Sequence, residues 1–503
     1  MYGGEEWNPH LLLRYGYTLD FFEAFAPLRM RGIELPLALI RPYHHFIRSA
    51  VDRRRTDGAY VRERGSSWNI HSMSDVQTRL RRLPGPAGSF GAEPGRDTIL
   101  LCGNYADFAL RHLTPHKVIL FSHYLYERRY LKNKKMPKSF EVYPLADKLL
   151  FGTTSKRVRK ETKELLRSFD RLHAAFRRTA GQHEVLARGA FHRWMHEEIP
   201  FIAELIDALH ELLRTRPIKL IVEHTELPPR QSILSLLARI HGLPFLHVQH
   251  HLSSDASMVP TRASHYAVWG RHMREWLIHR GIPPAAITET GSVRLELSRR
   301  PVVHTRDDLL AYCGWEPGAP ILVWMTEQYD ASVNYSVAAW LQETVRSLPV
   351  YAMIKPHPDD RLSYDAFVSE RLAVAPPFFH LDEMLHAADL VLTISSTTAV
   401  EAAMAAKGVI VLQPEMAYDY HLNYNGYVRH LANAEAGEIV HSGSGLTACL
   451  RIWLEDESFR SVLLDKGRSF LRKTLSSGGM SPGAAVYELV RRLLQSSGKE
   501  RTR

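Results

Sequence analysis

The residues best suited to chemistry follow an apolar run over residues 390–394, where four hydroxyl side chains lead directly into a predicted helix. They are Ser395, Ser396, Thr397 and Thr398, with Glu401 one turn into the helix. Hydroxyls and free backbone N–H groups at a helix N-terminus attract anions, and the helix dipole adds to the attraction. We therefore expect a diphosphate at Ser395, Ser396 and Thr397, and a ribose at Glu401. The alternative is that these side chains only cap the helix, for which one would suffice.

A lysine and a histidine follow a second apolar run, over residues 350–354. In Lys355-Pro356-His357-Pro358, the two prolines fix the backbone and prevent a helix. Lys355 supplies a positive charge for a phosphate, and His357 can donate to a phosphate oxygen or act as an acid. The alternative is a rigid turn with incidental side chains.

Carboxylates and imidazoles follow two runs in the first half of the chain. Glu223-His224-Thr225-Glu226 follows residues 219–222, and Gln249-His250-His251 follows residues 245–248. Such groups are candidates for a general base that removes a proton from an acceptor hydroxyl. We name Glu226 and Glu223 first, and His250 second.

The histidines also raise the question of a metal, and we predict none. His247, His250 and His251 lie close in sequence, but the chain has no HExxH pattern, and 27 histidines make chance clusters easy.

A glycine and an arginine occur together in the segment Thr290-Gly291-Ser292-Val293-Arg294, which follows the last predicted strand in the first part of the chain. A glycine lets the backbone approach a ligand and an arginine can clamp an anion, so we predict ligand contacts from Gly291 and Arg294. Neither a GxxxxGK[S/T] loop nor a GxGxxG fingerprint occurs, so the ATPase and dinucleotide-binding classes lack their signatures.

These segments must be held by alternating strands and helices. The predicted strands are 97–102, 117–121, 219–222, 245–248, 265–269, 288–290, 321–325, 350–354, 390–394 and 409–412. The predicted helices are 156–178, 202–213, 231–241, 271–279, 338–348, 381–388, 397–406, 445–455, 458–470 and 483–494. This alternation predicts an α/β fold with two Rossmann-like domains facing a cleft, and ligands beyond the carboxyl ends of the strands.

The same pattern gives the domain boundaries. Residues 1–300 form the first domain, whose irregular first 95 residues hold short helices and one strand near residues 35–40. Residues 301–480 form the second domain, after a linker over 297–320 with turn chemistry at 315–320. Residues 481–503 form a last helix and a basic tail.

Composition narrows the class of protein. The 503 residues carry a net charge of +10, only three cysteines, and no apolar run near the roughly 20 residues of a membrane span. The first residues show no secretory signal, so we expect a cytoplasmic protein whose basic surface suits anionic partners. The helix over 156–178 has nine Lys or Arg against three Asp or Glu. This basic face is either exposed to solvent or makes a peripheral contact with the inner face of the plasma membrane. Aromatic residues do not interleave with the basic runs in an RNA-binding pattern, so no nucleic-acid partner is expected.

Taken together, the stretches resemble GT-B-type sugar-nucleotide enzymes, above all bacterial glycosyltransferases of capsule and surface-polysaccharide synthesis. The resemblance covers most of residues 218–495 and rests on the order and spacing of KLIVEHTELPPRQSILSLLARIHGLPFLHVQHH, HYAVWGRHMREWLIHRGI, TETGSVRLE, YAMIKPHPDD, HLDEMLHAADLVLTISSTTAVEAAMAAKGVIVLQPE and DKGRSFLRKTLSSGGMSPGAAVYELVRRLL.

The resemblance implies a nucleotide-sugar donor on the C-terminal domain and a glycan or lipid-linked acceptor on the N-terminal domain. It implies no metal and no cofactor besides the donor. Lys355 and His357 match the phosphate-contacting "HP" element of CDP-glycerol-polymerising enzymes and of several bacterial sialyl- and Kdo-transferases. Ser395, Ser396 and Thr397 match the hydroxyl-rich phosphate loop, and Glu401 the carboxylate that contacts ribose. The last helix is expected to return onto the first domain.

Two positions depart from the family patterns. His251 stands where a glycine usually follows the glutamine–histidine pair, and Thr397 and Thr398 stand where the related UDP-N-acetylglucosamine 2-epimerases have a glycine pair. We therefore expect a glycosyltransferase that moves a sugar from a nucleotide-activated donor to a surface-polysaccharide or lipid-linked acceptor. The alternatives are a sugar-nucleotide epimerase and a CDP-alditol phosphotransferase.

Overall fold

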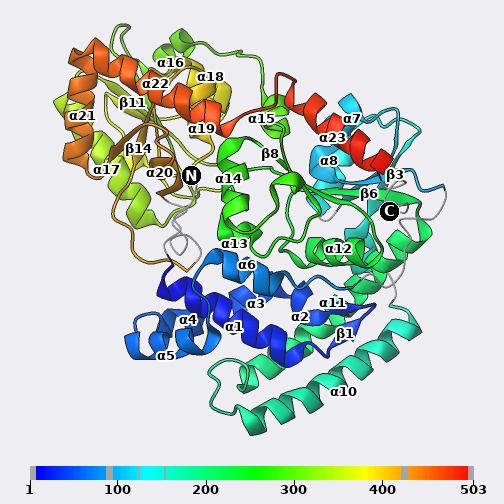
Figure 1. The fold of residues 1–503 in the computed structure, drawn as a ribbon. Coiled ribbons are helices and arrows are strands. Elements are labelled where there is room, and N and C mark those ends of the chain that lie inside the picture. Colours follow the sequence, from blue (N-terminus) through cyan, green and yellow to red (C-terminus); the bar gives the residue numbers. More distant parts are fainter. Residues whose placement is uncertain (1–6, 86–94, 123–124, 152–153, 421–428, 497–503) are drawn as a thin grey trace. The chain divides into compact units, whose positions relative to one another are not determined.

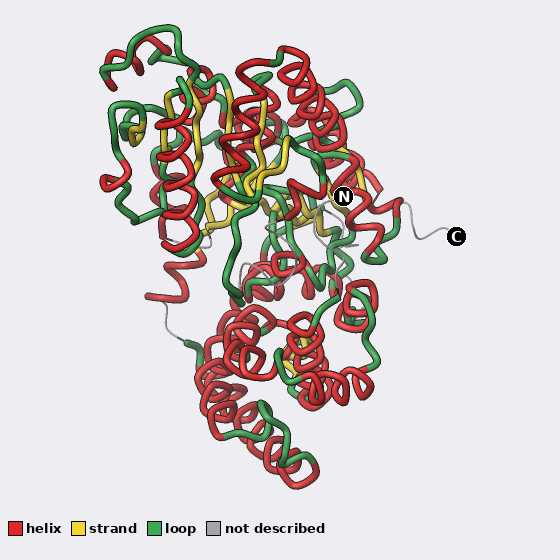
Figure 2. Tube along the Cα trace, turned by 90° about the vertical axis from the view of Figure 1, so that its left-hand side faces the viewer, coloured by secondary structure: helices red, strands yellow, loops and turns green. Residues whose placement is uncertain are grey.

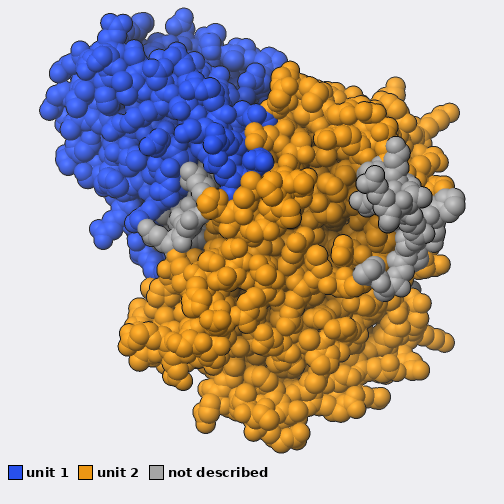
Figure 3. Space-filling model, viewed as in Figure 1, with its two compact units in different colours: residues 1–6, 269–276, 294–476 blue, residues 7–268, 277–293, 477–503 orange. Residues whose placement is uncertain are grey.

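The structure is a computed structural model that describes residues 7–85, 95–122, 125–151, 154–420 and 429–496. Contacts divide these residues into two compact units, which Figure 3 shows in two colours. Unit 1 holds residues 269–276 and 294–476, and unit 2 holds residues 7–268, 277–293 and 477–496. Among the described residues, the chain changes unit at 268–269, 276–277, 293–294 and 476–477.

Unit 2 is built on seven parallel strands in the order β5–β4–β3–β6–β7–β8–β9 (Figure 1). They are β3 (Thr98–Cys102), β4 (Lys117–Ser122), β5 (Phe140–Pro144), β6 (Ile218–Glu223), β7 (Phe245–Val248), β8 (His265–Val268) and β9 (Ile287–Glu289). The central strands are buried, and Figure 2 shows strands enclosed by helices. Burial on both faces is why these strands read as continuous apolar runs.

One set of helices accompanies this sheet. It comprises η2 (Gly103–Tyr105), α7 (Ala106–His112), α8 (Leu125–Lys132), α9 (Leu145–Phe151), α12 (Pro229–Ile240), α13 (Asp255–Met258), α14 (Arg271–His279, which begins in unit 1), η3 (Pro284–Ala286) and α23 (Pro482–Ser496). The last of these, α23, packs on α7 and β6.

A second set of helices in unit 2 surrounds the largely buried α1. It comprises α1 (Pro9–Phe25), α2 (Leu35–Ala38), α3 (Ile40–Phe46), α4 (Arg48–Arg54), α5 (Gly58–Trp68), α6 (Met73–Arg81), α10 (Lys156–Thr179) and α11 (Gly189–Thr215), with the antiparallel pair β1 (Arg29–Met30) and β2 (Ile33–Glu34). The strand predicted near residues 35–40 is wrong. Its apolar run is helical, with Pro36 in the first turn of α2, and a short buried run does not by itself distinguish helix from strand.

Unit 1 is built on six parallel strands in the order β12–β11–β10–β13–β14–β15, which is the strand order of a Rossmann fold. They are β10 (Ile321–Met325), β11 (Tyr351–Lys355), β12 (Leu372–Val374), β13 (Leu390–Thr393), β14 (Gly408–Leu412) and β15 (Glu438–Val440). The helices are α15 (Val293–Ser298), α16 (Arg306–Cys313), α17 (Ala331–Ser347), η4 (Asp365–Phe367), α18 (Leu381–Ala387), α19 (Thr398–Met404), α20 (His430–Asn433), α21 (Gly443–Glu455) and α22 (Glu457–Thr474).

The predicted fold class is confirmed, because both sheets are parallel and wound in the Rossmann manner. The predicted linker over 297–320 is wrong in part, since it contains α16. A capping box between Thr305 and Asp308 begins that helix, and Gly314 at φ +66° ends it. These caps are ordinary helix signals. The prolines and glycines on either side favoured the interpretation of the segment as a linker.

Candidate functional site

Each sheet has one place where its strand order reverses. In unit 2 it lies between β3 and β6, and in unit 1 between β10 and β13. At such a point, the loops that follow two neighbouring strands run in opposite directions and leave a crevice at the carboxyl ends of the strands. Ligands of open α/β sheets bind in that crevice. Most of the chemistry-bearing residues lie at or beside these two points.

In unit 1, the loop after β10 carries Glu327, a residue with no sequence signal for a role here. Its Oε1 accepts hydrogen bonds from the backbone N–H groups of Ile394 and Ser395, at 3.0 and 2.8 Å. Its Oε2 accepts one from the Ser395 hydroxyl at 2.5 Å, and the Thr393 hydroxyl donates to Oε1 at 3.2 Å. A carboxylate of the chain itself therefore occupies the backbone N–H groups of Ile394 and Ser395, at the start of the predicted phosphate loop.

These contacts correct the expectation that Ser395 is open to a ligand. Ser395 is fully buried, and its hydroxyl also lies 2.5 Å from the Tyr329 hydroxyl. Ser396 is half-buried, and its hydroxyl accepts from the Thr398 backbone N–H at 3.2 Å. It also lies 2.9 Å from the Thr398 hydroxyl. The two serines therefore bond within the loop, whereas the N-cap residue of α19, Thr397, makes no side-chain cap hydrogen bond.

The third hydroxyl of the run, Thr397, is placed differently. It accepts a hydrogen bond at 3.2 Å from Nη2 of Arg294, which lies on α15, and both residues are half-buried. The structure thus brings together two predicted anion contacts that are about a hundred positions apart in the sequence. Glu401 lies near the same guanidinium. Burial raises the pKa of Glu401, and the charge of Arg294 offsets part of that rise.

The lysine and histidine lie at the same edge, in and after β11. The His357 backbone N–H donates to the Thr326 hydroxyl at 2.9 Å, and its Nδ1 accepts from the Asp359 backbone N–H at 3.1 Å. Because Nδ1 is an acceptor, the neutral ring carries its proton on Nε2, and the side chain is 40% exposed. Lys355 is half-buried and its Nζ donates to the Phe379 carbonyl at 2.7 Å. Burial lowers the pKa of Lys355.

The two predicted phosphate-binding segments therefore follow strands of the same sheet that are separated by one strand, β10. β10 lies between β11 and β13, and its loop connects to both sides. Thr326 bonds to the segment of His357, and Glu327 bonds to the segment of Ser395.

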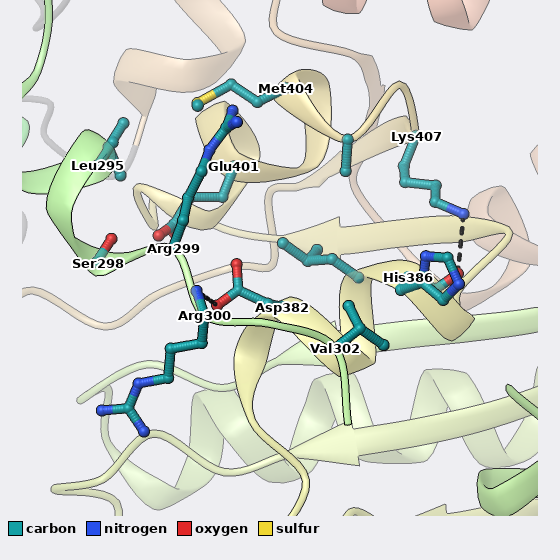
Figure 4. A pocket seen from close by; sticks show the side chains of 12 residues that line it. Leu295, Ser298, Arg299, Arg300, Val302, Asp382, His386, Glu401, Met404 and Lys407 are labelled. Carbon is teal, nitrogen blue, oxygen red and sulfur yellow. Dashed lines mark hydrogen bonds between the residues drawn. The ribbon is translucent and has the colours of Figure 1, made fainter. Parts of the chain in front are cut away.

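A cavity of about 360 Å³ opens in unit 1 between α15, α18 and α19 (Figure 4). Its charged and imidazole lining comprises Arg299, Arg300, Asp382, His386, Glu401 and Lys407. Lys407 Nζ donates to the His386 carbonyl at 3.2 Å. The lining carries both signs of charge, so the cavity suits a polar ligand with hydroxyl groups better than a bare anion.

In unit 2, the reversal point brings together a thiol, a carboxylate and two imidazoles. Glu223 is 1% exposed and its Oε2 lies 3.8 Å from Nδ1 of His224. Cys102 Sγ lies 3.3 Å from the same nitrogen. The rings of His224 and His250 are half-buried, with centroids 5.2 Å apart, and Tyr105 packs edge-on against both. Burial raises the pKa of the Cys102 thiol, and the nearby Glu223 adds to the rise.

Glu226, the carboxylate named first as the base, is enclosed by partners of its own chain. It is 1% exposed, and its Oε1 bonds to the Thr261 hydroxyl and lies 3.2 Å from His247 Nδ1. Its Oε2 accepts from the Arg262 backbone N–H at 2.6 Å. Burial alone would raise the pKa of Glu226, yet these hydrogen bonds leave it lowered. The carboxylate ties its loop to residues 261–262 and is unsuited to take a proton from a substrate.

Gly291 lies where the chain packs closely. It has φ +71°, and a Cβ at this position would lie 2.9 Å from Cγ of Pro482. The start of α23 therefore packs closely against the backbone of Gly291. The packing gives Gly291 a structural role, and its predicted ligand contact stays a prediction.

Comparisons with known proteins found similar solved structures but no matching family. No protein-family model and no curated protein matches the chain. A Listeria monocytogenes protein assigned as a UDP-N-acetylglucosamine 2-epimerase is 12% identical, covers 80% of this chain and 97% of its own, and has a TM-score of 0.49. A glycosyltransferase from Rickettsia africae is 10% identical, covers 81% and 100%, and has a TM-score of 0.47.

A third similar structure is the UDP-GlcNAc 2-epimerase of Neisseria meningitidis bound to UDP-GlcNAc. It is 11% identical, covers 79% of this chain and 100% of its own, and has a TM-score of 0.47. At these identities and TM-scores, the likenesses carry no conclusion about activity. Among the described residues, no helix is both long and apolar enough to cross a membrane.

Proposed function

We propose that the chain is a GT-B-type glycosyltransferase that moves a sugar from a nucleotide-activated donor to a surface-polysaccharide or lipid-linked acceptor. The observation that carries the proposal is the contact of Arg294 with Thr397 after β13, together with His357 in the loop after β11, on the other side of β10 in the same parallel sheet. A guanidinium, a hydroxyl and an imidazole N–H are all donors suited to phosphate oxygens.

These donors would act on the leaving group. Negative charge grows on the nucleotide phosphates as the bond to the sugar breaks, and donors already in place stabilise that charge in the transition state. Arg294 supplies a charge held by its bond to Thr397, and His357 presents Nε2 on an exposed ring. Lys355 adds positive charge, while one of its donors fixes the loop at Phe379.

The sugar or ribose hydroxyls would be bound by Glu401. Its carboxylate opens onto the cavity of Figure 4 and lies near the charge of Arg294. Ser395 and Ser396 would contribute by holding the loop, since their hydroxyls are bonded within it.

The base that activates the acceptor would come from unit 2. His250 and His224 are half-buried imidazoles, and the buried Glu223 lies behind His224. A carboxylate behind an imidazole orients the ring and stabilises its protonated form, which favours proton removal from a hydroxyl. Glu223 would then be a positioning residue and an imidazole the base.

No metal and no cofactor is proposed for the transfer, because Arg294 can supply the positive charge that a metal supplies elsewhere, and His357 can add a hydrogen-bond donor. We propose a cytoplasmic site of action, with the basic helix α10 as a peripheral contact to anionic headgroups, and no nucleic-acid partner.

The donor is tested first by thermal shift against UDP-, CDP- and CMP-linked sugars, because a ligand that binds only the native state raises its stability. Transfer from the stabilising donor is then assayed with and without lipid-linked and oligosaccharide acceptors. Epimerised donor without acceptor would identify an epimerase instead, and alditol phosphate transfer from a CDP-linked donor would identify the phosphotransferase. Salt-sensitive RNA binding with no response to any nucleotide sugar would overturn the enzyme proposal.

Replacing His357 by Ala is the direct test of the leaving-group site. We expect turnover to fall on the order of 10²-fold, as when one charge-stabilising donor is lost. The matched control is His441→Ala, which removes an exposed imidazole that follows the edge strand β15 of the same sheet. Equal turnover in the two variants would remove His357 from the mechanism.

A further inference from the structure

Two long helices of unit 2, α10 and α11, pack against each other away from the sheet edge described above. One side chain of α10 and two of α11 converge on a single point. Nε2 of His192 and Nε2 of His196 lie 2.9 and 2.8 Å from the same carboxylate oxygen, Oδ1 of Asp170. The three ligand atoms all lie within 4.8 Å of one another.

We propose that Asp170, His192 and His196 form a binding site for a divalent metal ion of the zinc class, which clamps α10 to α11. The proposal is independent of the transferase activity. Two imidazoles four residues apart on a helix, with one carboxylate, form a three-ligand set that zinc accepts with a water in the fourth position.

The two distances to Asp170 require only a small adjustment. Ligand atoms about 2.1 Å from a tetrahedral ion lie roughly 3.4 Å apart. The imidazole nitrogens are 2.8–2.9 Å from Oδ1, so the carboxylate would move by about half an ångström as the ion enters. All three side chains are partly exposed, so an ion can reach them without opening the core.

The imidazoles are held in place before any ion binds. Phe169 is fully buried on α10, and its ring packs against His192 and His196 at centroid distances of 5.5 and 5.8 Å. The two imidazole rings are themselves 4.5 Å apart. A ligand set whose rotamers are fixed by packing loses little entropy on binding, which favours affinity.

The alternative is an ordinary hydrogen-bonded cluster in which both imidazole N–H groups donate to Asp170. Replacing both His192 and His196 by Gln distinguishes a metal site from a hydrogen-bonded cluster. The Gln amide can still donate to the carboxylate, but it does not replace the imidazole as a zinc ligand.

The experiment uses the full chain, freed of metal by a chelator and titrated with Zn²⁺ alone. Wild type is expected to bind one Zn²⁺ that raises its melting temperature. The double variant His192→Gln/His196→Gln is expected to keep the metal-free melting temperature and to lose at least tenfold in affinity, since even changes behind a ligand cost that much. His71→Ala, which removes an exposed histidine elsewhere in unit 2, serves as the control.

A second potential ligand group, Cys102 with Glu223 and His224, must be distinguished. Co²⁺ does this, because binding to a thiolate gives a charge-transfer band that imidazole and carboxylate ligands lack. We expect Co²⁺-loaded wild type to give a spectrum without that band. The double variant should not give this Co²⁺ spectrum. No Zn²⁺ binding by wild type, or unchanged binding by the double variant, would overturn the proposal.

Discussion

Ser395 and Glu327 are bonded to each other twice: the Ser395 hydroxyl donates to Oε2 of Glu327 at 2.5 Å, and its backbone N–H donates to Oε1 at 2.8 Å. The loop after β13 is thus closed by a carboxylate from the loop after β10. We therefore expect the donor phosphates beyond that bond, toward Thr397 and Arg294.

The neighbouring hydroxyls should therefore behave differently on mutation. Ser395→Ala removes a buried hydrogen bond to a charged group, so we expect a stability loss of about 1.5–3 kcal/mol, seen as a lower melting temperature. The donor should still bind with near wild-type affinity. Thr397→Val keeps the shape but removes the hydroxyl, so donor affinity should fall about fivefold with little change in melting temperature. The opposite pattern would return Ser395 to the phosphate site.

The sequence predicted this edge but not its internal carboxylate. The apolar runs of β10, β11 and β13 and the polar residues after them are local signals, and each was placed within a residue or two. The partnership of Glu327 with residues 394–395 depends on β10 lying beside β13. Strand order is set by contacts between distant segments, which one sequence does not display.

Glu383 makes the linker of unit 1 sensitive to acid. Its carboxylate accepts hydrogen bonds from the backbone N–H groups of Val303, His304 and His380, at 3.1, 3.0 and 2.7 Å. Burial would raise the pKa of Glu383, but these bonds lower it to about 2. The contact fixes the segment that contributes Arg300 and Val302 to the cavity wall.

The sign of the pH effect follows from that shift. A carboxylate whose folded pKa lies below its unfolded value near ~4.3 stabilises the fold above that value and loses this contribution as the pH falls toward 2. We expect Glu383→Gln to cost about 2 kcal/mol at pH 7 and much less at pH 3. Melting temperatures of both proteins across this range measure the difference. A constant difference at all pH values would contradict the assignment.

The imidazoles of unit 2 should set the acidic limb of the pH–rate profile. His250→Gln and His224→Gln each remove a candidate base, and we expect one of them to lower kcat by about 10²- to 10⁴-fold and to abolish that limb. Glu223→Gln should shift the limb without abolishing it, because the carboxylate acts through the ring. Glu226→Gln is the control: its melting temperature should fall while the limb stays. An acidic limb that survives both histidine variants would place the base elsewhere.

Glu223 and Glu226 show why these roles could not be separated by sequence. They are three positions apart after the same strand, and both are 1% exposed. What separates them is the surroundings: Thr261 and Arg262 enclose Glu226, whereas Glu223 lies beside His224 and Cys102. Thr261, Arg262 and Cys102 come from distant parts of the chain, so composition and spacing around one strand predict a carboxylate site but not which carboxylate serves it.

Gly291 gives a last prediction, for which the chain supplies its own control. Gly291 and Gly478 have similar backbone angles, φ +71° and +62°, but a Cβ at Gly291 would meet Pro482 at 2.9 Å, whereas one at Gly478 would meet nothing within 4 Å. Gly478→Ala should therefore show the backbone cost alone, about 1–2 kcal/mol. Gly291→Ala should cost more, because the start of α23 must move, and α23 should become more sensitive to proteolysis. If Gly291→Ala instead keeps its melting temperature and loses donor binding, the glycine serves a ligand after all, and packing against Pro482 is not its function.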